Sequence, residues 1–289
     1  MDNFIFNSHS YSNAQQMYQK GVVAYTQHDM TMAIEYLKEA AKHRHSEAQA
    51  CLGKIYYEYR NWVEAVIWNK KAAEQGNISA MVNLGRIYYV GGYGVLKDEA
   101  ESICWLQKAA EQGDVTAQID LVMIYEAKQN YVEVVKWCRK AAEKGNARAQ
   151  YKLGKCYESG KGVEIDYGEA ADWYRKAAER DYAKAQYDLG ICYYKGRGVR
   201  KSKMIAIQWL RKAEKLGVGK AKPILRRWRI VKWLLVIGSL FIIGAIIAYV
   251  MIKERVIASD VDPRIWGPLI KVLIGIAVLC AAVGRDGDT

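Results

Sequence analysis

The sequence predicts an all-α fold, an α/α solenoid of about six helix pairs followed by one or two transmembrane helices. An aromatic residue with alanine four positions later recurs six times, at spacings of 32, 37, 32, 36 and 36 residues. A period of about 20 to 50 residues is typical of solenoids. After the last copy, residues 233–252 carry no charge, and an apolar run of about 20 residues is long enough to cross a bilayer.

Each repeat has the pattern of two helices. A small residue with apolar neighbours marks the first helix, and the aromatic with its alanine marks the second. Small residues let two helices approach closely, while Trp and Tyr fill the space between neighbouring pairs. The small position holds Gly21, Gly53, Gly85, Gly154 and Gly190, and once Val122. The aromatic pairs are Tyr36/Ala40, Trp68/Ala72, Trp105/Ala109, Trp137/Ala141, Trp173/Ala177 and Trp209/Ala213.

Glycines and short polar residues predict where the helices end. A glycine with left-handed backbone is expected to end the second helix at Gly76, Gly113, Gly145 and Gly217. The next first helix should then be capped by Asn77, Asp114 and Asn146. Three repeats have a longer connection within the pair, where positive φ is expected at Gly92, Gly94, Gly160, Gly162, Gly196 and Gly198.

One of these longer turns, "SGKGV" at 159–163, has the glycines and lysine of a phosphate loop. A phosphate loop needs four residues between its first glycine and a Gly-Lys-Ser/Thr triplet, with a strand before it. Here five residues separate Gly154 from Gly160, Lys161 is followed by Gly162, and a helix pattern comes first. The segment is therefore interpreted as a turn.

The pattern LGxxYxxGxGVxxDxxxAxxWYxKAAExGxxxAQ runs through residues 153–186 almost without departure. It resembles the Sel1-like repeats, a branch of the tetratricopeptide-like α/α solenoids, and the resemblance covers about residues 14–221. Three units lack the glycine turn and resemble the shorter tetratricopeptide version. The resemblance implies a scaffold that binds protein partners on a concave face lined by the first helices.

The family's ligand-contacting positions flank the glycine of the first helix. Carried over to this sequence, they predict partner contacts at Tyr18, Tyr25, Lys54, Tyr57, Arg86, Tyr89, Tyr151, Lys155, Tyr187 and Tyr194. Aromatic and basic anchors are enriched at interfaces, although a tyrosine at helical spacing also packs between repeats. A groove of this kind suits an extended peptide, a helix or the edge of a domain.

The C-terminal part has the pattern of a membrane anchor. Basic and Trp residues at the near end of 233–252 place that end, and the repeats, in the cytoplasm by the positive-inside rule. A second apolar run spans residues 266–284. It has Pro268 in the first turn, where proline suits a helix, and Lys271 one turn in, where its side chain could reach the headgroups. It predicts a helical hairpin, with a monotopic or partner-buried helix as the alternative.

The chain accordingly divides into seven segments. They are an N-terminal segment 1–13, the repeats 14–221, a basic juxtamembrane linker 222–232, a transmembrane helix 233–252, a loop 253–265, the second apolar segment 266–284 and a tail 285–289.

Positive charge is concentrated before the anchor. The net charge is +12, and Glu214 is the only acid between Asp188 and Glu254. Each Lys or Arg near an anionic bilayer gains about 1 kcal/mol, so membrane lipid is the expected partner of this stretch. Nucleic acid is the less favoured partner, because the basic residues become more numerous toward the anchor. The membrane-surface residues are Lys220, Lys222, Arg226, Arg227, Arg229 and Lys232.

The sequence offers little catalytic chemistry. Its six cysteines form no CxxC pair, its four histidines all precede residue 46, and no HExxH or Gly-x-Ser-x-Gly motif is present. No metal, cofactor or enzymatic activity is therefore predicted. The N-terminal segment lacks a basic region followed by an apolar one, so we expect no signal peptide.

These observations predict a non-enzymatic adaptor, anchored in a membrane and binding a partner protein at the cytoplasmic face. The family resemblance suggests a bacterial inner membrane. Two alternatives share the sequence features. One is a membrane effector whose C-terminal hairpin forms homo-oligomers or permeabilises the bilayer, while the repeats sense a trigger or inhibitor. The other is an immunity-type protein that binds a toxin.

Overall fold

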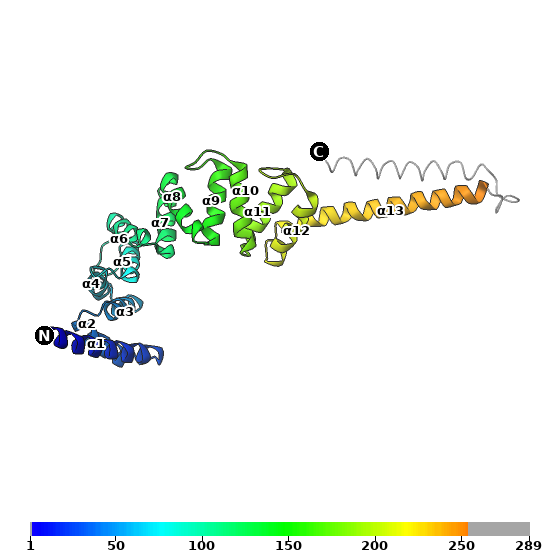
Figure 1. Ribbon diagram of the computed structural model, residues 1–289. Helices are drawn as coiled ribbons and strands as arrows, with labels where there is room; N and C mark the ends of the chain where they lie inside the picture. The colour runs from blue at the N-terminus through cyan, green and yellow to red at the C-terminus, as the bar shows by residue number, and fades with distance from the viewer. Residues whose placement is uncertain (1, 254–289) are drawn as a thin grey trace. The chain divides into compact units, whose positions relative to one another are not determined.

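The structure, a computed structural model, describes residues 2–253, and these form helices joined by turns, with no strand among them (Figure 1). The all-α prediction is confirmed. The second apolar segment 266–284, most of the loop 253–265 and the tail 285–289 lie outside the described residues. The helices are α1 (Asp2–Thr26), α2 (Met30–Lys42), α3 (Ser46–Glu58), α4 (Trp62–Ala73), α5 (Ile78–Val90), α6 (Glu99–Glu111), α7 (Val115–Ala127), α8 (Tyr131–Glu143), α9 (Ala147–Ser159), α10 (Tyr167–Glu179), α11 (Ala183–Lys195), α12 (Lys203–Lys215) and α13 (Ala221–Lys253).

The described helices form the six expected pairs. Odd-numbered helices pack on the even-numbered helix that follows, from α1 on α2 to α11 on α12. The chain divides into two compact units, residues 1–182 with the first five pairs and residues 183–289 with the sixth pair and α13. Within the first unit, each second helix also packs on the first helix of the next pair (Figure 1).

The small position brings the two helices of a pair into close contact. A Cβ at Gly154 would lie 2.6 Å from Cε1 of Tyr174, and one at Gly190 would lie 2.8 Å from Cγ of Leu210. Real Cβ atoms do not come this close, so a larger residue would push the helices apart. The partner of the glycine is in every case the residue that follows the recurring aromatic.

The fourth pair solves the same packing problem in the opposite way. Val122 replaces the glycine, and the residue after the aromatic is the small Cys138 instead of a leucine, asparagine or tyrosine. Both side chains are buried. The larger side chain on α7 is thus matched by a smaller one on α8, which keeps the two helices at the spacing of the other pairs.

The recurring tryptophans are held by neighbours on their own helices. In four pairs the indole Nε1 donates a hydrogen bond of 2.8–3.1 Å to the glutamate four residues earlier. A lysine three residues later lies over the ring, 3.8–4.8 Å from its centroid. These contacts hold the ring in one orientation, which positions it to fill the space between pairs.

The turns agree with the sequence except at one glycine. Positive φ occurs at all four glycines predicted to end second helices and at five of the six in the longer turns. The prediction for Gly92 is wrong, because Gly91 adopts the left-handed backbone instead, with φ of 72°. Gly92 pairs with Val95 through two backbone hydrogen bonds of 2.9 and 3.0 Å. A Cβ there would lie 2.5 Å from Cδ1 of Trp62, so close packing explains this glycine.

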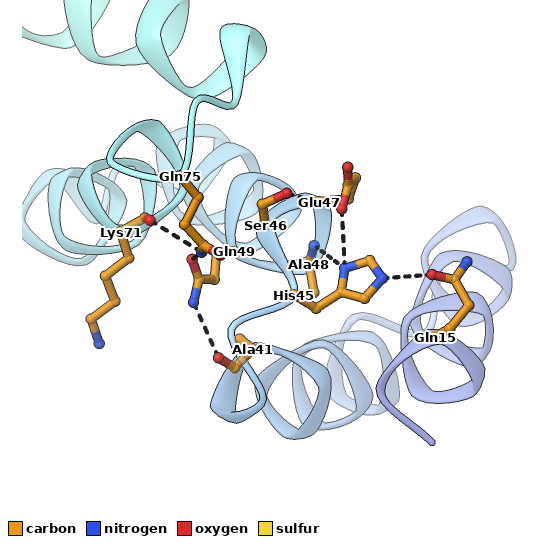
Figure 2. A network of polar contacts seen from close by, with 9 residues as sticks. All are labelled: Gln15, Ala41, His45, Ser46, Glu47, Ala48, Gln49, Lys71 and Gln75. Atoms are coloured by element: carbon orange, nitrogen blue, oxygen red, sulfur yellow. Dashed lines mark hydrogen bonds and ion pairs between the residues drawn. The ribbon is translucent and has the colours of Figure 1, made fainter. Parts of the chain in front are cut away.

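The first helices are capped by short polar side chains, as expected at Asn77, Asp114 and Asn146. At the start of α3 the cap is His45, a nearly buried residue whose Nδ1 accepts the Ala48 N–H at 3.3 Å (Figure 2). Its Nε2 lies 2.7 Å from Oε1 of Gln15, and its ring stacks on Tyr18 with centroids 4.7 Å apart. One imidazole therefore caps α3 and also joins it to α1.

Buried glutamines join successive pairs. The Nε2 of Gln49, Gln118 and Gln150 donates to a carbonyl eight residues earlier, in the last turn of the preceding second helix, at 3.0–3.1 Å. In Figure 2 the Gln49 amide also accepts a hydrogen bond of 2.7 Å from Gln75. Each of these carbonyls also accepts a backbone N–H of the turn that follows, at 2.9–3.1 Å, so the glutamine adds a second bond that joins the pairs.

Helix α13 contains both the predicted juxtamembrane linker, residues 222–232, and the predicted span 233–252. The linker residues are helical and continuous with 233–252. Among the described residues, Ala221–Val250 is the one helical stretch long and apolar enough to cross a membrane. Its most apolar part has a mean hydropathy of 2.5, and only 6% of that part is buried in the structure.

The pair packing predicts a compensating substitution. Gly85→Val alone should destabilise the chain by about 1–3 kcal/mol, because the new side chain meets Leu106. Adding Leu106→Cys copies the Val122/Cys138 arrangement. The loss in unfolding free energy of the double variant should therefore be smaller, by at least about 1 kcal/mol, than the sum of the losses of the two single variants. The free energy of unfolding in urea, followed by circular dichroism, measures this. As a control, the effects of Leu210→Cys and Gly85→Val on the free energy of unfolding should be additive. Additive effects in both double variants would contradict the explanation.

The His45 network predicts a graded response. Asparagine, the cap of α5 and α9, should restore the α3 cap but not the contacts with Gln15 and Tyr18. We expect the order of stability wild type, then His45→Asn, then His45→Ala, with about 0.5–2 kcal/mol between the two variants. Thermal unfolding of the three proteins measures the order. Equal stability of the two variants would show that the imidazole is not needed as a cap.

Candidate partner-binding site

Three of the predicted contact residues come together in one pocket. Tyr57 from α3 and Arg86 and Tyr89 from α5 line an opening of about 230 Å³. Helix α7 contributes three further lining residues. The remaining lining residues are Val90, Leu106, Asp120, Met123 and Ile124.

An ion pair joins two repeats at this pocket. The Arg86 Nε donates to Oδ2 of Asp120 at 2.7 Å, across 34 residues of sequence. The Asp120 side chain is only 11% exposed, whereas the Arg86 side chain is 44% exposed. The hydrogen bond to Asp120 raises the pKa of Arg86, and partial burial opposes this rise. The guanidinium is thus oriented by one carboxylate while much of its surface remains open to a ligand.

The rest of the pocket is apolar and open. Tyr57 packs edge-on against Trp62, with centroids 4.9 Å apart, and Lys97 lies 5.3 Å from the ring centroid of Tyr89. Val90 and Met123 are 61% and 43% exposed. Aromatic and methionine side chains beside an oriented arginine are the composition of an interface anchor point.

Predicted residues of the first two pairs lie outside this pocket. Tyr25 donates to Glu58 at 3.0 Å, and Lys54 lies 5.7 Å from the Tyr25 ring and 3.8 Å from Glu58. Tyr18 is the residue stacked on His45. Burial is the main cause that raises the pKa of both tyrosines. The two tyrosines therefore join neighbouring repeats, and Lys54 remains exposed above them.

Predicted residues of the fifth pair also take part in packing. Tyr151 lies between Tyr174 and Tyr182, with ring centroids 5.7 and 5.2 Å away. Lys155 is exposed, and its Nζ lies 2.5 Å from Oε2 of Glu158. No lining residue of the Arg86 pocket comes from this pair.

The second unit holds the last two predicted contacts. Tyr187 is half-buried against the cluster of Leu210, Ala221 and Leu225. The Tyr194 ring lies 5.2 Å from that of Trp228. Both tyrosines pack against helices of their own unit.

The predicted membrane-surface residues lie on α13 or immediately before it. Lys220 precedes the helix, and the other five belong to its first three turns. The exposed side chains among them are Lys220, Lys222, Arg226, Arg227 and Arg229.

Sequence reasoning missed Asp120 and Met123. Asp120 stands two residues before Val122, whereas the prediction used tyrosines and basic residues around the recurring glycine. A signal was available, because charge occurs at this position in three repeats, as Asp120, Lys152 and Asp188. Lys152 also forms an ion pair with Glu126 of the preceding repeat. The fourth pair was omitted because Val122 breaks the glycine pattern.

Comparison with known proteins identifies the repeats. The family model described as Sel1 repeat matches residues 11–45, 46–77, 78–114, 125–146, 147–182 and 183–218. A Sel1 repeat protein from Oxalobacter formigenes is 30% identical with a TM-score of 0.64, and the match covers 72% of this chain and 88% of that one. No curated protein matches the chain.

A second solved structure is a protective antigen of uropathogenic Escherichia coli with an SLR fold. It is 34% identical with a TM-score of 0.61, and the match covers 74% of this chain. It covers 48% of the antigen, so this chain spans about half the length of that protein.

The ion pair predicts an asymmetry between its two partners. Arg86→Gln leaves a nearly buried carboxylate without its cation and should destabilise the chain by about 1–3 kcal/mol. Asp120→Asn leaves a largely exposed guanidinium and should cost less than about 1 kcal/mol. Urea unfolding of both variants measures the difference. A larger loss for Asp120→Asn would contradict the burial argument.

Proposed function

The chain belongs to the Sel1 repeat family, and from that premise we propose that it is a membrane-anchored adaptor whose repeats bind a partner protein at the cytoplasmic face of a membrane. Sel1 repeat proteins mediate protein–protein interaction, and the fold is typically a non-enzymatic scaffold. Both of the similar proteins described above come from bacteria, which supports a bacterial inner membrane as the location.

The observation that carries the proposal is the exposure of the apolar residues of α13. Its side chains from Trp233 to Val250 are largely open, including Leu240 and Ile246. A helix that is apolar on all sides and unburied has a large free-energy cost in water, and a bilayer removes that cost. Basic residues at its near end favour an orientation with the repeats in the cytoplasm.

The Arg86 pocket is the proposed partner site. Its exposed Tyr89, Val90 and Met123 would bind an apolar side chain, while the open part of Arg86 would bind a carboxylate or a backbone carbonyl. A peptide or helix with an acidic and an apolar residue within one or two turns fits this chemistry. The pocket is small, so neighbouring exposed residues of the same face would supply further contacts.

The anchor is tested by extraction of membranes with alkaline carbonate. The full chain should stay in the pellet, and a chain that ends at residue 232 should be released, because an integral helix resists extraction and a surface charge cluster does not. Release of the full chain would refute the anchor.

The partner site is tested by crosslinking in membranes and quantitative mass spectrometry of captured proteins. Tyr89→Ala with Met123→Ala should reduce the recovery of a specific partner about ten-fold or more, because anchor residues contribute most of the binding free energy. Tyr93→Ala with Val132→Ala is the control, since both residues are exposed and neither lines the pocket. Equal recovery from the two variants would place the partner site elsewhere.

A further inference from the structure

The second unit contains a pocket between α12 and α13 that lies where the exposed polar part of the chain meets the apolar helix. It has a volume of about 530 Å³. Its polar and aromatic lining residues are Arg211 and Glu214 from α12 and Trp228, Arg229 and Trp233 from α13. The other lining residues are the apolar Ile207 from α12 and Leu225 and Val236 from α13.

The pocket follows one stripe of α13. The lining residues that follow Leu225 on this helix lie three, four, eight and eleven positions after it, which places them on a single face. Arg226 and Arg227 belong to the same basic stretch but do not line the pocket. Only some residues of the basic stretch therefore line the pocket. Diffuse attraction to an anionic surface would involve all of them equally.

Along α13 the charged Arg229 lies between two apolar lining residues, with Leu225 before it and Val236 after it. Arg229 stands before the uncharged run that begins at Trp233, and Val236 lies within that run. Seven residues separate Arg229 from Val236, about 10 Å along the helix. A ligand with an anionic group and an alkyl chain would match Arg229 and the apolar run that follows it.

The charges define the anionic end. Arg211 and Arg229 are exposed, and neither forms an ion pair with the residues from 2 to 253. Two guanidinium groups without carboxylate partners suit a phosphate. Glu214, the one acid in this region of the sequence, lies one turn from Arg211 on the same helix. Its carboxylate accepts hydrogen bonds, which suits a headgroup that carries hydroxyl donors beside the phosphate.

We propose that this pocket binds a single anionic phospholipid with a hydroxyl-bearing headgroup, its phosphate on Arg211 and Arg229 and its acyl chain against Val236. Trp228 and Trp233 are suited to the headgroup level, where tryptophan is enriched in membrane proteins. The proposal rests on the proposed anchoring of α13 in a membrane. It adds a stoichiometric lipid site, which orients the last repeat pair on the bilayer surface.

Native mass spectrometry of the full-length protein in detergent tests the site. Phosphatidylglycerol is the probe, and phosphatidylcholine with the same acyl chains is the reference. The wild type should bind one phosphatidylglycerol in preference to phosphatidylcholine. Arg211→Gln with Arg229→Gln should weaken phosphatidylglycerol binding about ten-fold or more, because both charge-assisted contacts are lost.

Arg226→Gln with Arg227→Gln is the matched control. It removes the same charge from the same basic region, and it should weaken binding less than about three-fold. Equal weakening by the two double variants would overturn the pocket in favour of diffuse electrostatic attraction, and equal binding of the two lipids would overturn the headgroup assignment. Displacement of the lipid by an equal concentration of soluble glycerol phosphate would show that the acyl chain contributes nothing, which would also overturn the proposal.

Carbonate extraction of the same variants separates this proposal from the anchor. Retention in the membrane together with loss of phosphatidylglycerol binding only in the Arg211/Arg229 variant supports both proposals. Retention without any lipid preference overturns the lipid site alone. Release of the wild type from membranes overturns the anchor, while the binding measured in detergent still decides whether the pocket takes the lipid. Thermal unfolding shows that the variants remain folded.

Discussion

The close approach of two helices within each pair is the constraint on which the described structure depends. The pair can form at its observed spacing only if one of two facing positions is small. Glycine satisfies this on the first helix of five pairs, and in the fourth pair Cys138 on the second helix takes the small position opposite Val122. The side chains that lie outside this contact then point either to the neighbouring pair or to the exposed surface.

Contacts between successive pairs use a small set of polar bonds in addition to apolar packing. Buried glutamines bind the carbonyls at the ends of second helices, and His45 caps one helix while it contacts another. The ion pair of Arg86 and Asp120 belongs to the same class, because it joins one repeat to the next. Its partial exposure distinguishes it, so the same arginine contributes both to the repeat array and to the candidate site.

The chain places two different kinds of surface in its two units. The first unit presents an arginine beside aromatic and aliphatic side chains, which suits a peptide. The second unit presents arginines beside tryptophans at the start of an apolar helix, which suits a lipid. Residues 222–232 are helical, so within the second unit no irregular segment separates the basic residues from the apolar ones. A rigid connection of this kind would let lipid binding orient the last repeat pair.

The sequence by itself determined the helix pairs, most of their turns and the apolar C-terminal helix, because these depend on local patterns. Periodicity, glycine at positive φ and the length of an uncharged run are properties of neighbouring residues. The tertiary structure alone decided which predicted contact residues lie together. Tyr57, Arg86 and Tyr89 share a pocket, whereas Tyr151, Tyr187 and Tyr194 pack against their own units. It also decided that Asp120 and Met123 belong to the site and that Gly92 is small for packing. The reason is physical: equivalent positions in successive repeats have the same local sequence but different neighbours, and burial depends on those neighbours.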